Sequence, residues 1–138
     1  MKKKLLLMLT LCLLAQWSVA QAPKWVDKAK RAVFSVVTYD QDDKILNTGN
    51  GFFVTEDGVA LSDYTLFKGA RRAVVMSSDG AQMPVEAIMG ADDMYDVVKF
   101  RVGIPGKKVT ALTLAAVAPA VGADVYLSLI HISEPTRP

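Results

Sequence analysis

The sequence has little of the two residue types that most often carry catalytic or redox chemistry. It contains one cysteine and one histidine among 138 residues. Cys12 lies inside an apolar run near the N-terminus, so its removal with that run would leave no thiol for a disulfide or a nucleophile. His131 lies close to the C-terminus, in a segment whose origin is discussed below.

Recognisable metal and phosphate motifs are also missing. Asp92, Asp93 and Asp96 lack the alternate spacing, glycine turn and final glutamate of a calcium loop, and we interpret them as part of a solvated loop. We interpret Asp40, Asp42 and Asp43 as the tip of a polar hairpin. Gly49-Asn50-Gly51 is not followed by the Lys-Ser/Thr pair and helix of a phosphate loop. We therefore expect no metal site and no cofactor.

The N-terminal segment predicts export. Lys2 to Lys4 precede the apolar run Leu5–Leu14, and small residues follow at the spacing that signal peptidase recognises, ending at Ala20 or Ala22. The run is shorter than the roughly 20 residues that cross a bilayer. Leu11 precedes Cys12 where a lipoprotein signal has a small residue. We expect residues 1–22 to be a cleaved signal peptide, giving a periplasmic or secreted protein without a membrane anchor; a retained anchor is the alternative.

The chain has no excess charge once its ends are set aside. The whole sequence has a pI near 8.7, but residues 23–126 contain twelve basic and thirteen acidic residues, a formal net charge of −1. The basic residues are scattered among acids rather than gathered in a patch. This composition gives no support to nucleic-acid binding.

The C-terminal residues 127–138 have a different character. Residues 127–137 resemble, residue for residue, one translated reading frame of an adapter used to build sequencing libraries. We expect this tail to be foreign, so His131 is assigned no function and the natural sequence continues beyond Tyr126. The alternative is a genuine C-terminal strand with a proline-rich end.

Between these ends, the pattern predicts a short helix followed by many short strands. The helix is expected at residues 23–31, where apolar residues recur on one face. Val98, Phe100 and Val102 alternate with charged residues, as in a strand with one buried face. Expected strands lie at residues 32–39, 45–48, 52–54, 59–62, 73–76, 83–88, 96–102, 109–114 and 124–126. No linker or repeat interrupts them, so residues 32–126 are predicted to form one small β-barrel or sandwich.

Several motifs occur in the order found in one protease family. They are Gly49–Ser62, Lys68–Ala70, Ser78–Gly80, Val85–Gly90, Asp96–Val98 and Ala118–Tyr126. Together they resemble the first half of HtrA/Deg-type, trypsin-like serine proteases, and the resemblance covers residues 32–126. It implies an all-β fold: the N-terminal antiparallel barrel of the two-barrel architecture, with six or seven strands, preceded by the short helix. It also implies an incomplete domain, because that family's serine and oxyanion loop belong to the second barrel.

The resemblance assigns two residues to the triad region. Asp96 matches the catalytic aspartate, and Thr65 stands where the family has its histidine. A threonine hydroxyl has no basic lone pair near neutral pH and cannot shuttle a proton, so the chain is predicted to be inactive. Two readings of Asp96 remain open: a vestigial triad acid, or an ordinary aspartate that opens a strand. For Thr65 we favour a buried hydroxyl bonded to Asp96 or to the backbone.

Three hypotheses for function follow. The first is a fragment of an exported, non-catalytic protease homologue that binds extended peptides or unfolded proteins, or serves as a scaffold. The second is the N-terminal half of an active serine endopeptidase whose nucleophile lobe is absent here. The third is a structural β-barrel that shares only the fold. None of them requires nucleic acid or a membrane, and none sets the oligomeric state.

Overall fold

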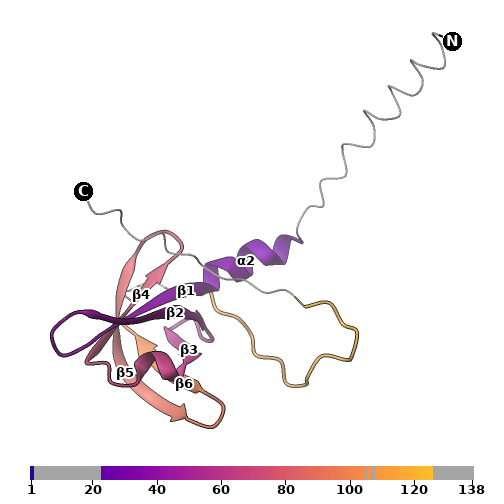
Figure 1. Ribbon diagram of the computed structural model, residues 1–138. Helices are drawn as coiled ribbons and strands as arrows, with labels where there is room; N and C mark the ends of the chain where they lie inside the picture. Colours follow the sequence, from indigo (N-terminus) through magenta and orange to yellow (C-terminus); the bar gives the residue numbers. More distant parts are fainter. Residues whose placement is uncertain (2–22, 105, 107, 126–138) are drawn as a thin grey trace.

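The computed structural model describes residues 1, 23–104, 106 and 108–125 (Figure 1). Its elements, in chain order, are α2 (Lys24–Ala32), β1 (Val33–Tyr39), β2 (Ile45–Phe53), β3 (Val59–Asp63), the 3₁₀-helix η2 (Tyr64–Phe67), β4 (Arg72–Ser77), β5 (Gln82–Asp92) and β6 (Val97–Val102). The expected signal peptide with Cys12, and the expected foreign tail with His131, lie outside the described residues. None of the helices in the described part is long and apolar enough to cross a membrane.

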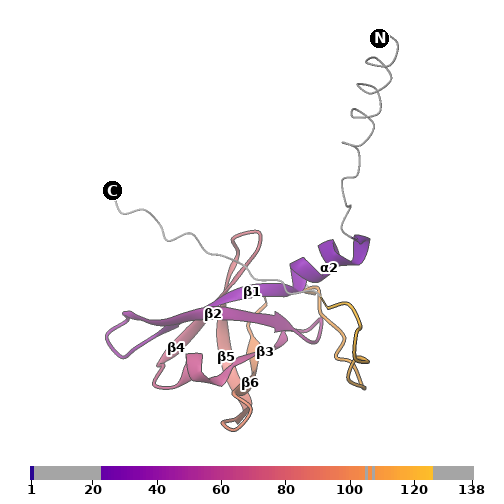
Figure 2. The same ribbon diagram turned by 45° about the vertical axis from the view of Figure 1, so that its right-hand side comes forward.

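The six strands form a closed antiparallel barrel in the order β1-β2-β3-β6-β5-β4, with β4 pairing back onto β1. Helix α2 leads into β1 and projects away from the barrel in both views (Figures 1 and 2). The sequence pattern predicted this helix at residues 23–31, so both predicted ends come one residue before the observed ends. The prediction of an antiparallel β-barrel preceded by a short helix is confirmed, with six strands among the described residues.

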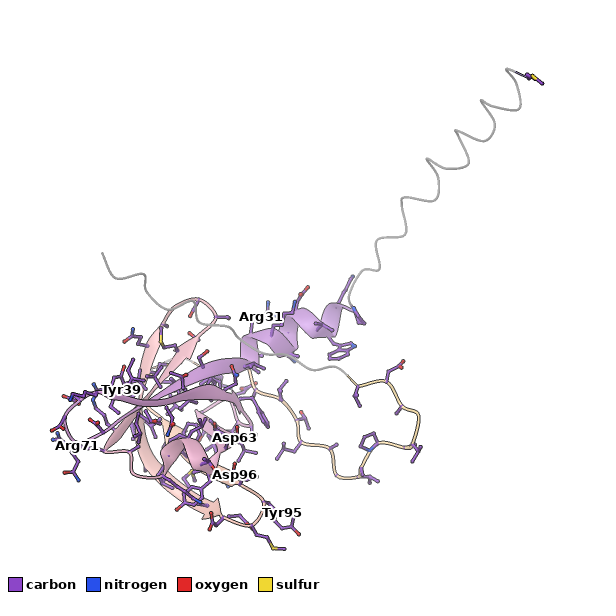
Figure 3. The ribbon with its side chains drawn as sticks, in the orientation of Figure 1. Arg31, Tyr39, Asp63, Arg71, Tyr95 and Asp96 are labelled. Carbon is purple, nitrogen blue, oxygen red and sulfur yellow. The ribbon has the colours of Figure 1, made fainter. Side chains whose placement is uncertain are left out.

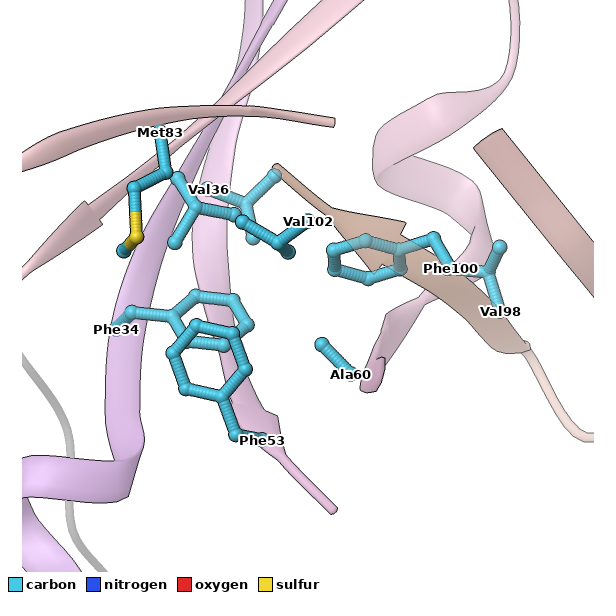
Figure 4. Packing of buried hydrophobic residues seen from close by; sticks show 9 residues of the cluster. Phe34, Val36, Phe53, Ala60, Met83, Val98, Phe100 and Val102 are labelled. Atoms are coloured by element: carbon cyan, nitrogen blue, oxygen red, sulfur yellow. The ribbon is translucent and has the colours of Figure 1, made fainter. Parts of the chain in front are cut away.

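Alternating apolar residues of the strands fill the barrel. Phe34, Phe53 and Phe100 are buried and lie together, with ring centroids 4.7 Å apart for Phe34–Phe53 and 6.3 Å apart for Phe34–Phe100 (Figure 4). The ring centroid of Phe67 in η2 lies 5.0 Å from that of Phe100, and Phe67 packs against the core beside it. The aromatic cluster therefore couples β1, β2, β6 and η2.

Strand β2 is longer than the sequence pattern predicted. Gly49-Asn50-Gly51, expected to separate two short strands, lies within it. A Cβ atom at Gly51 would come within 2.6 Å of the Phe34 ring and 2.7 Å of the Leu61 carbonyl oxygen. Glycine is present here because the aromatic core and the β3 backbone leave no room for a side chain, not because the chain turns.

The segment after β6 forms no strand in its described part. The strands expected at residues 109–114 and 124–126 are therefore wrong as far as residue 125, and Tyr126 lies outside the described residues. The barrel closes through β1 to β6 without this segment. Val109 and Ala111 pack instead against the core, and isolated backbone bonds tie Val109 to Glu56 and Leu112 to Phe53.

Candidate functional site at the contact between Thr65 and Asp96

The ends of two paired strands bring Thr65 and Asp96 together. Strand β3 ends at Asp63 and β6 begins at Val97, and these two residues are partners in the β3–β6 ladder. Thr65 lies just beyond the end of β3, in η2, and Asp96 lies just before β6. Figure 3 shows Asp63 and Asp96 at the same end of the barrel. The antiparallel pairing thus places residues 31 positions apart in the sequence within bonding distance.

Asp96 holds the start of η2 through three hydrogen bonds. Its Oδ1 accepts from the Thr65 backbone N–H at 2.6 Å and from the Thr65 hydroxyl at 2.8 Å. Its backbone carbonyl accepts from the Tyr64 N–H at 3.1 Å. Two of these donors are backbone N–H groups of the first helical turn, which have no partner within the helix itself.

The loop before β6 shapes the backbone at Asp96. Asp92 Oδ1 accepts hydrogen bonds from the backbone N–H groups of Met94 at 2.9 Å and Tyr95 at 3.0 Å, which closes a tight turn. Asp96 has a φ of 53°, in the left-handed region that aspartate tolerates better than most residues. Asp96 thus lies immediately before β6, which begins one residue later than expected, and its carboxylate bonds a nearby backbone N–H group. Asp92, expected in this loop, is the last residue of β5.

A lysine next to the site is held in its charged form. Lys68 forms an ion pair with Asp93 and lies over the Tyr64 ring, 5.1 Å from its centroid. The hydrogen bond to Asp93 raises the pKa of Lys68 above its usual value. Lys68 is therefore protonated at neutral pH and cannot serve as a general base in place of an imidazole.

The contact between Thr65 and Asp96 is a set of hydrogen bonds that orients a backbone turn. The Thr65 hydroxyl donates to a carboxylate, and the side chain is exposed rather than buried as expected. Among the described residues there is no histidine, and no cluster of three or more His, Cys, Asp or Glu side chains could hold a metal ion.

A second feature, a groove in the barrel wall, had no signal in the sequence. The β4–β5 ladder covers only residues 74–76 and 82–84, so the rest of β5 runs alongside β6 alone. A cavity of about 380 Å³ opens there between Phe67, the start of β4 and the apolar residues Val85 and Ile88. A neighbouring cavity of about 360 Å³ shares Ala70 and Arg71 with it. The long-range strand register that creates this groove cannot be read from local patterns.

Ion pairs across the barrel surface also had no sequence signal. The exposed Arg72 pairs with Asp43 at 2.8 Å, and its guanidinium carbon lies 3.6 Å from the centroid of the Tyr39 ring. The hydrogen bond from Arg72 lowers the pKa of Asp43 below its usual range. Asp40 closes the β1–β2 turn by accepting from the N–H groups of Asp42 and Lys44. These acidic residues thus belong to the hairpin and do not converge on a ligand.

No family model and no curated protein matches the chain. The likeness to HtrA/Deg-type proteases thus remains a resemblance of motifs, and the fold alone does not set a function.

Proposed function

We propose that this chain contains the first barrel of an exported, trypsin-like serine protease homologue of the HtrA/Deg type that does not cleave peptides. In this proposal the domain binds extended peptide segments or acts as a scaffold. The observation that carries the proposal is the contact between Thr65 and Asp96. Residues that the motif resemblance assigned independently to the histidine and aspartate positions are bonded to each other.

The bonding pattern explains why such a site would be inert. In a Ser-His-Asp triad, the aspartate orients an imidazole that accepts the proton of the serine. Here the Asp96 carboxylate accepts two hydrogen bonds from Thr65, so it stabilises a turn and orients no base. Loss of one triad member leaves only roughly 10³–10⁴-fold acceleration over water, even in an otherwise intact protease. Lys68 cannot substitute, because an exposed lysine is protonated at neutral pH and its ion pair with Asp93 raises the pKa further.

A fluorophosphonate probe, which reacts with activated serines, tests this proposal. The protein should be prepared from its complete natural gene and incubated with the probe beside an active trypsin-like protease as the positive control. We expect no labelling of the wild-type protein. Robust labelling would show that another group has replaced the histidine and would support an active endopeptidase instead.

A further inference from the structure

On the β4–β5 side of the barrel, much of β5 has no ladder partner other than β6 among the described residues. After Pro84, β5 continues to Asp92 with a partner only in β6. Irregularities in the β5–β6 register occur between Val85 and Ala87 and between Ile88 and Gly90. Such bulges bend a strand, and here the bend separates β5 from β4 and opens the barrel wall.

A similar gap on the opposite side of the barrel is filled. The β2–β3 ladder is also short, covering residues 51–53 and 60–62. There η2 lies against the free part of β2: the Leu66 carbonyl accepts hydrogen bonds from Asn47 Nδ2 at 3.3 Å and from the Thr38 hydroxyl at 2.9 Å. A Cβ atom at Gly49 would clash with Leu66, which shows how closely η2 packs on β2. The edge of β5 has no such cover.

Apolar side chains line much of the groove beside β5, among them Phe67, Val98, Val85 and Ile88. Charged side chains complete the lining: Arg71, Arg72 and Glu86. Ile88 remains 51% exposed and Met89 48% exposed, an unusual degree for large apolar residues on a paired strand. An unpaired strand edge beside apolar pockets is the arrangement that binds a peptide by strand addition.

One end of the groove is basic. Arg71 lines both cavities. Its guanidinium donates to the Gln41 carbonyl oxygen at 3.4 Å and forms no ion pair with any described residue. Figure 3 shows Arg71 beside Tyr39 at the end of the barrel where β4 begins, and its backbone N–H bonds the Tyr39 carbonyl at 2.8 Å. A carboxylate at this end of a bound peptide could form an ion pair with the Arg71 guanidinium.

We infer that the groove between β4 and β5 binds an extended peptide segment of another protein, which pairs with β5 and places a carboxylate against Arg71. The free stretch of β5 accommodates a strand of about six residues, at roughly 3.3 Å per residue. Alternate side chains of the peptide would enter the groove, so apolar residues at every second position are preferred. This inference rests on the proposed function only in treating the domain as one that binds peptides without cleaving them.

Fluorescence anisotropy on the full chain tests the inference. The probe is a fluorescein-labelled peptide of alternating threonine and valine that ends in a free aspartate. We expect saturable binding that is lost when alternate backbone amides of the peptide are methylated on the pairing edge, but kept when the other amides are methylated. Binding that is indifferent to the methylation pattern would overturn strand addition.

Matched variants test the two ends of the groove. Arg71→Gln should weaken binding of the acidic peptide about fivefold at low salt, as a rim charge does, whereas Arg31→Gln on the projecting helix should leave it unchanged. A peptide ending in asparagine amide should bind wild type and Arg71→Gln equally. Ile88→Ser should weaken binding of both peptides, and the exposed-loop control Met94→Ser should not. Equal effects of Arg71→Gln and Arg31→Gln would contradict the charge assignment.

Two further outcomes separate this inference from its competitors. If the chain dimerises on its own, if Ile88→Ser abolishes the dimer and if no peptide binds, then a second copy occupies the groove and the inference is wrong. Probe labelling of an active serine would overturn the proposed function but would leave the peptide titration unaffected. The two ideas can therefore fail separately.

Discussion

At the scale of single residues, Asp96 combines an unusual backbone conformation with an acceptor role. Its φ of 53° is disfavoured for residues with a Cβ atom, and its carboxylate accepts both bonds from Thr65. The side chain thus offsets the strain of its own backbone by fixing the start of η2. Other residues could adopt the left-handed backbone conformation, and others could accept the hydrogen bonds from Thr65, but few residues can do both.

A substitution series at Asp96 separates these roles. Asp96→Ala should lower the free energy of unfolding by about 1–3 kcal/mol, because it removes the acceptor and keeps a strained Cβ. Asp96→Asn should lower it least, since asparagine tolerates the left-handed region and retains an oxygen acceptor. Asp96→Gly should lie between them. Urea unfolding at neutral pH measures all three, and a loss for Asp96→Asn as large as that for Asp96→Ala would refute the bonding described here.

At the scale of elements, β2 can approach the core closely because Gly51 has no side chain. Gly51→Ala should destabilise the protein by about 1–3 kcal/mol, because the new methyl group meets the Phe34 ring and the Leu61 carbonyl. Gly90→Ala in β5 is the matched control: a Cβ atom there meets nothing within 4 Å, so the change should stay within about 0.5 kcal/mol. Thermal unfolding of both variants checks the contrast, which would vanish if β2 were free to shift.

The β2–β3 turn is tied to β6 through Asp57. A hydrogen bond from the Thr55 hydroxyl, and next one from Arg101 at 3.2 Å, lower the pKa of Asp57 below its usual range. A lowered folded-state pKa gives stability that is present above the unfolded pKa and is lost as pH falls through the folded pKa.

The stability difference between wild type and Asp57→Asn should therefore be constant above about pH 5 and shrink below about pH 4. Chemical unfolding over this range measures it. Thr55→Ala should remove more of this pH-dependent part than Arg101→Gln, because the Thr55 bond has the larger effect on the pKa. A larger effect of Arg101→Gln than of Thr55→Ala would show that Arg101 is the main cause of the lowered pKa of Asp57.

At the scale of the whole molecule, stability depends on a few aromatic contacts in a small core. Phe100 is fully buried and contacts both Phe34 and Phe67, so it joins the barrel interior to η2. Phe100→Ala should cost about 3–5 kcal/mol, enough to unfold a domain of this size, whereas Phe100→Leu should cost much less. Circular dichroism melting curves distinguish the two. A folded Phe100→Ala variant with near wild-type stability would contradict this account of the core.

The sequence predicted the strands well where local alternation determines them. The pattern of Val98, Phe100 and Val102 matches their burial in β6. Prediction failed where distant contacts decide the structure. Gly51 was expected to lie between two short strands. The reason for a glycine there, the Phe34 ring that a side chain would meet, is visible only once β1 and β2 are paired. Residues 109–114 had looked like a strand, yet they lie against a barrel that is already closed.

The candidate site was predictable only in part for the same reason. The order of the motifs assigned Thr65 to the histidine position and Asp96 to the aspartate position of the family's triad. The β3–β6 pairing brings these two residues together. The left-handed backbone of Asp96 and the ion pair between Lys68 and Asp93 depend on the loop after β5, which the sequence pattern did not specify. The groove along β5 depends on bulges that no local signal marks.

The most direct test of the proposed triad correspondence is to place an imidazole at position 65. In Thr65→His, the Asp96 carboxylate should raise the pKa of the new imidazole above its ordinary value of about 6.5, as an opposite charge within bonding distance does. An NMR pH titration measures it, with wild type used to identify the signal of His131 and the double variant Thr65→His/Asp96→Asn as the control. We predict a raised pKa that falls back in the double variant; the same pKa in both variants would show that position 65 is not the histidine position of a triad.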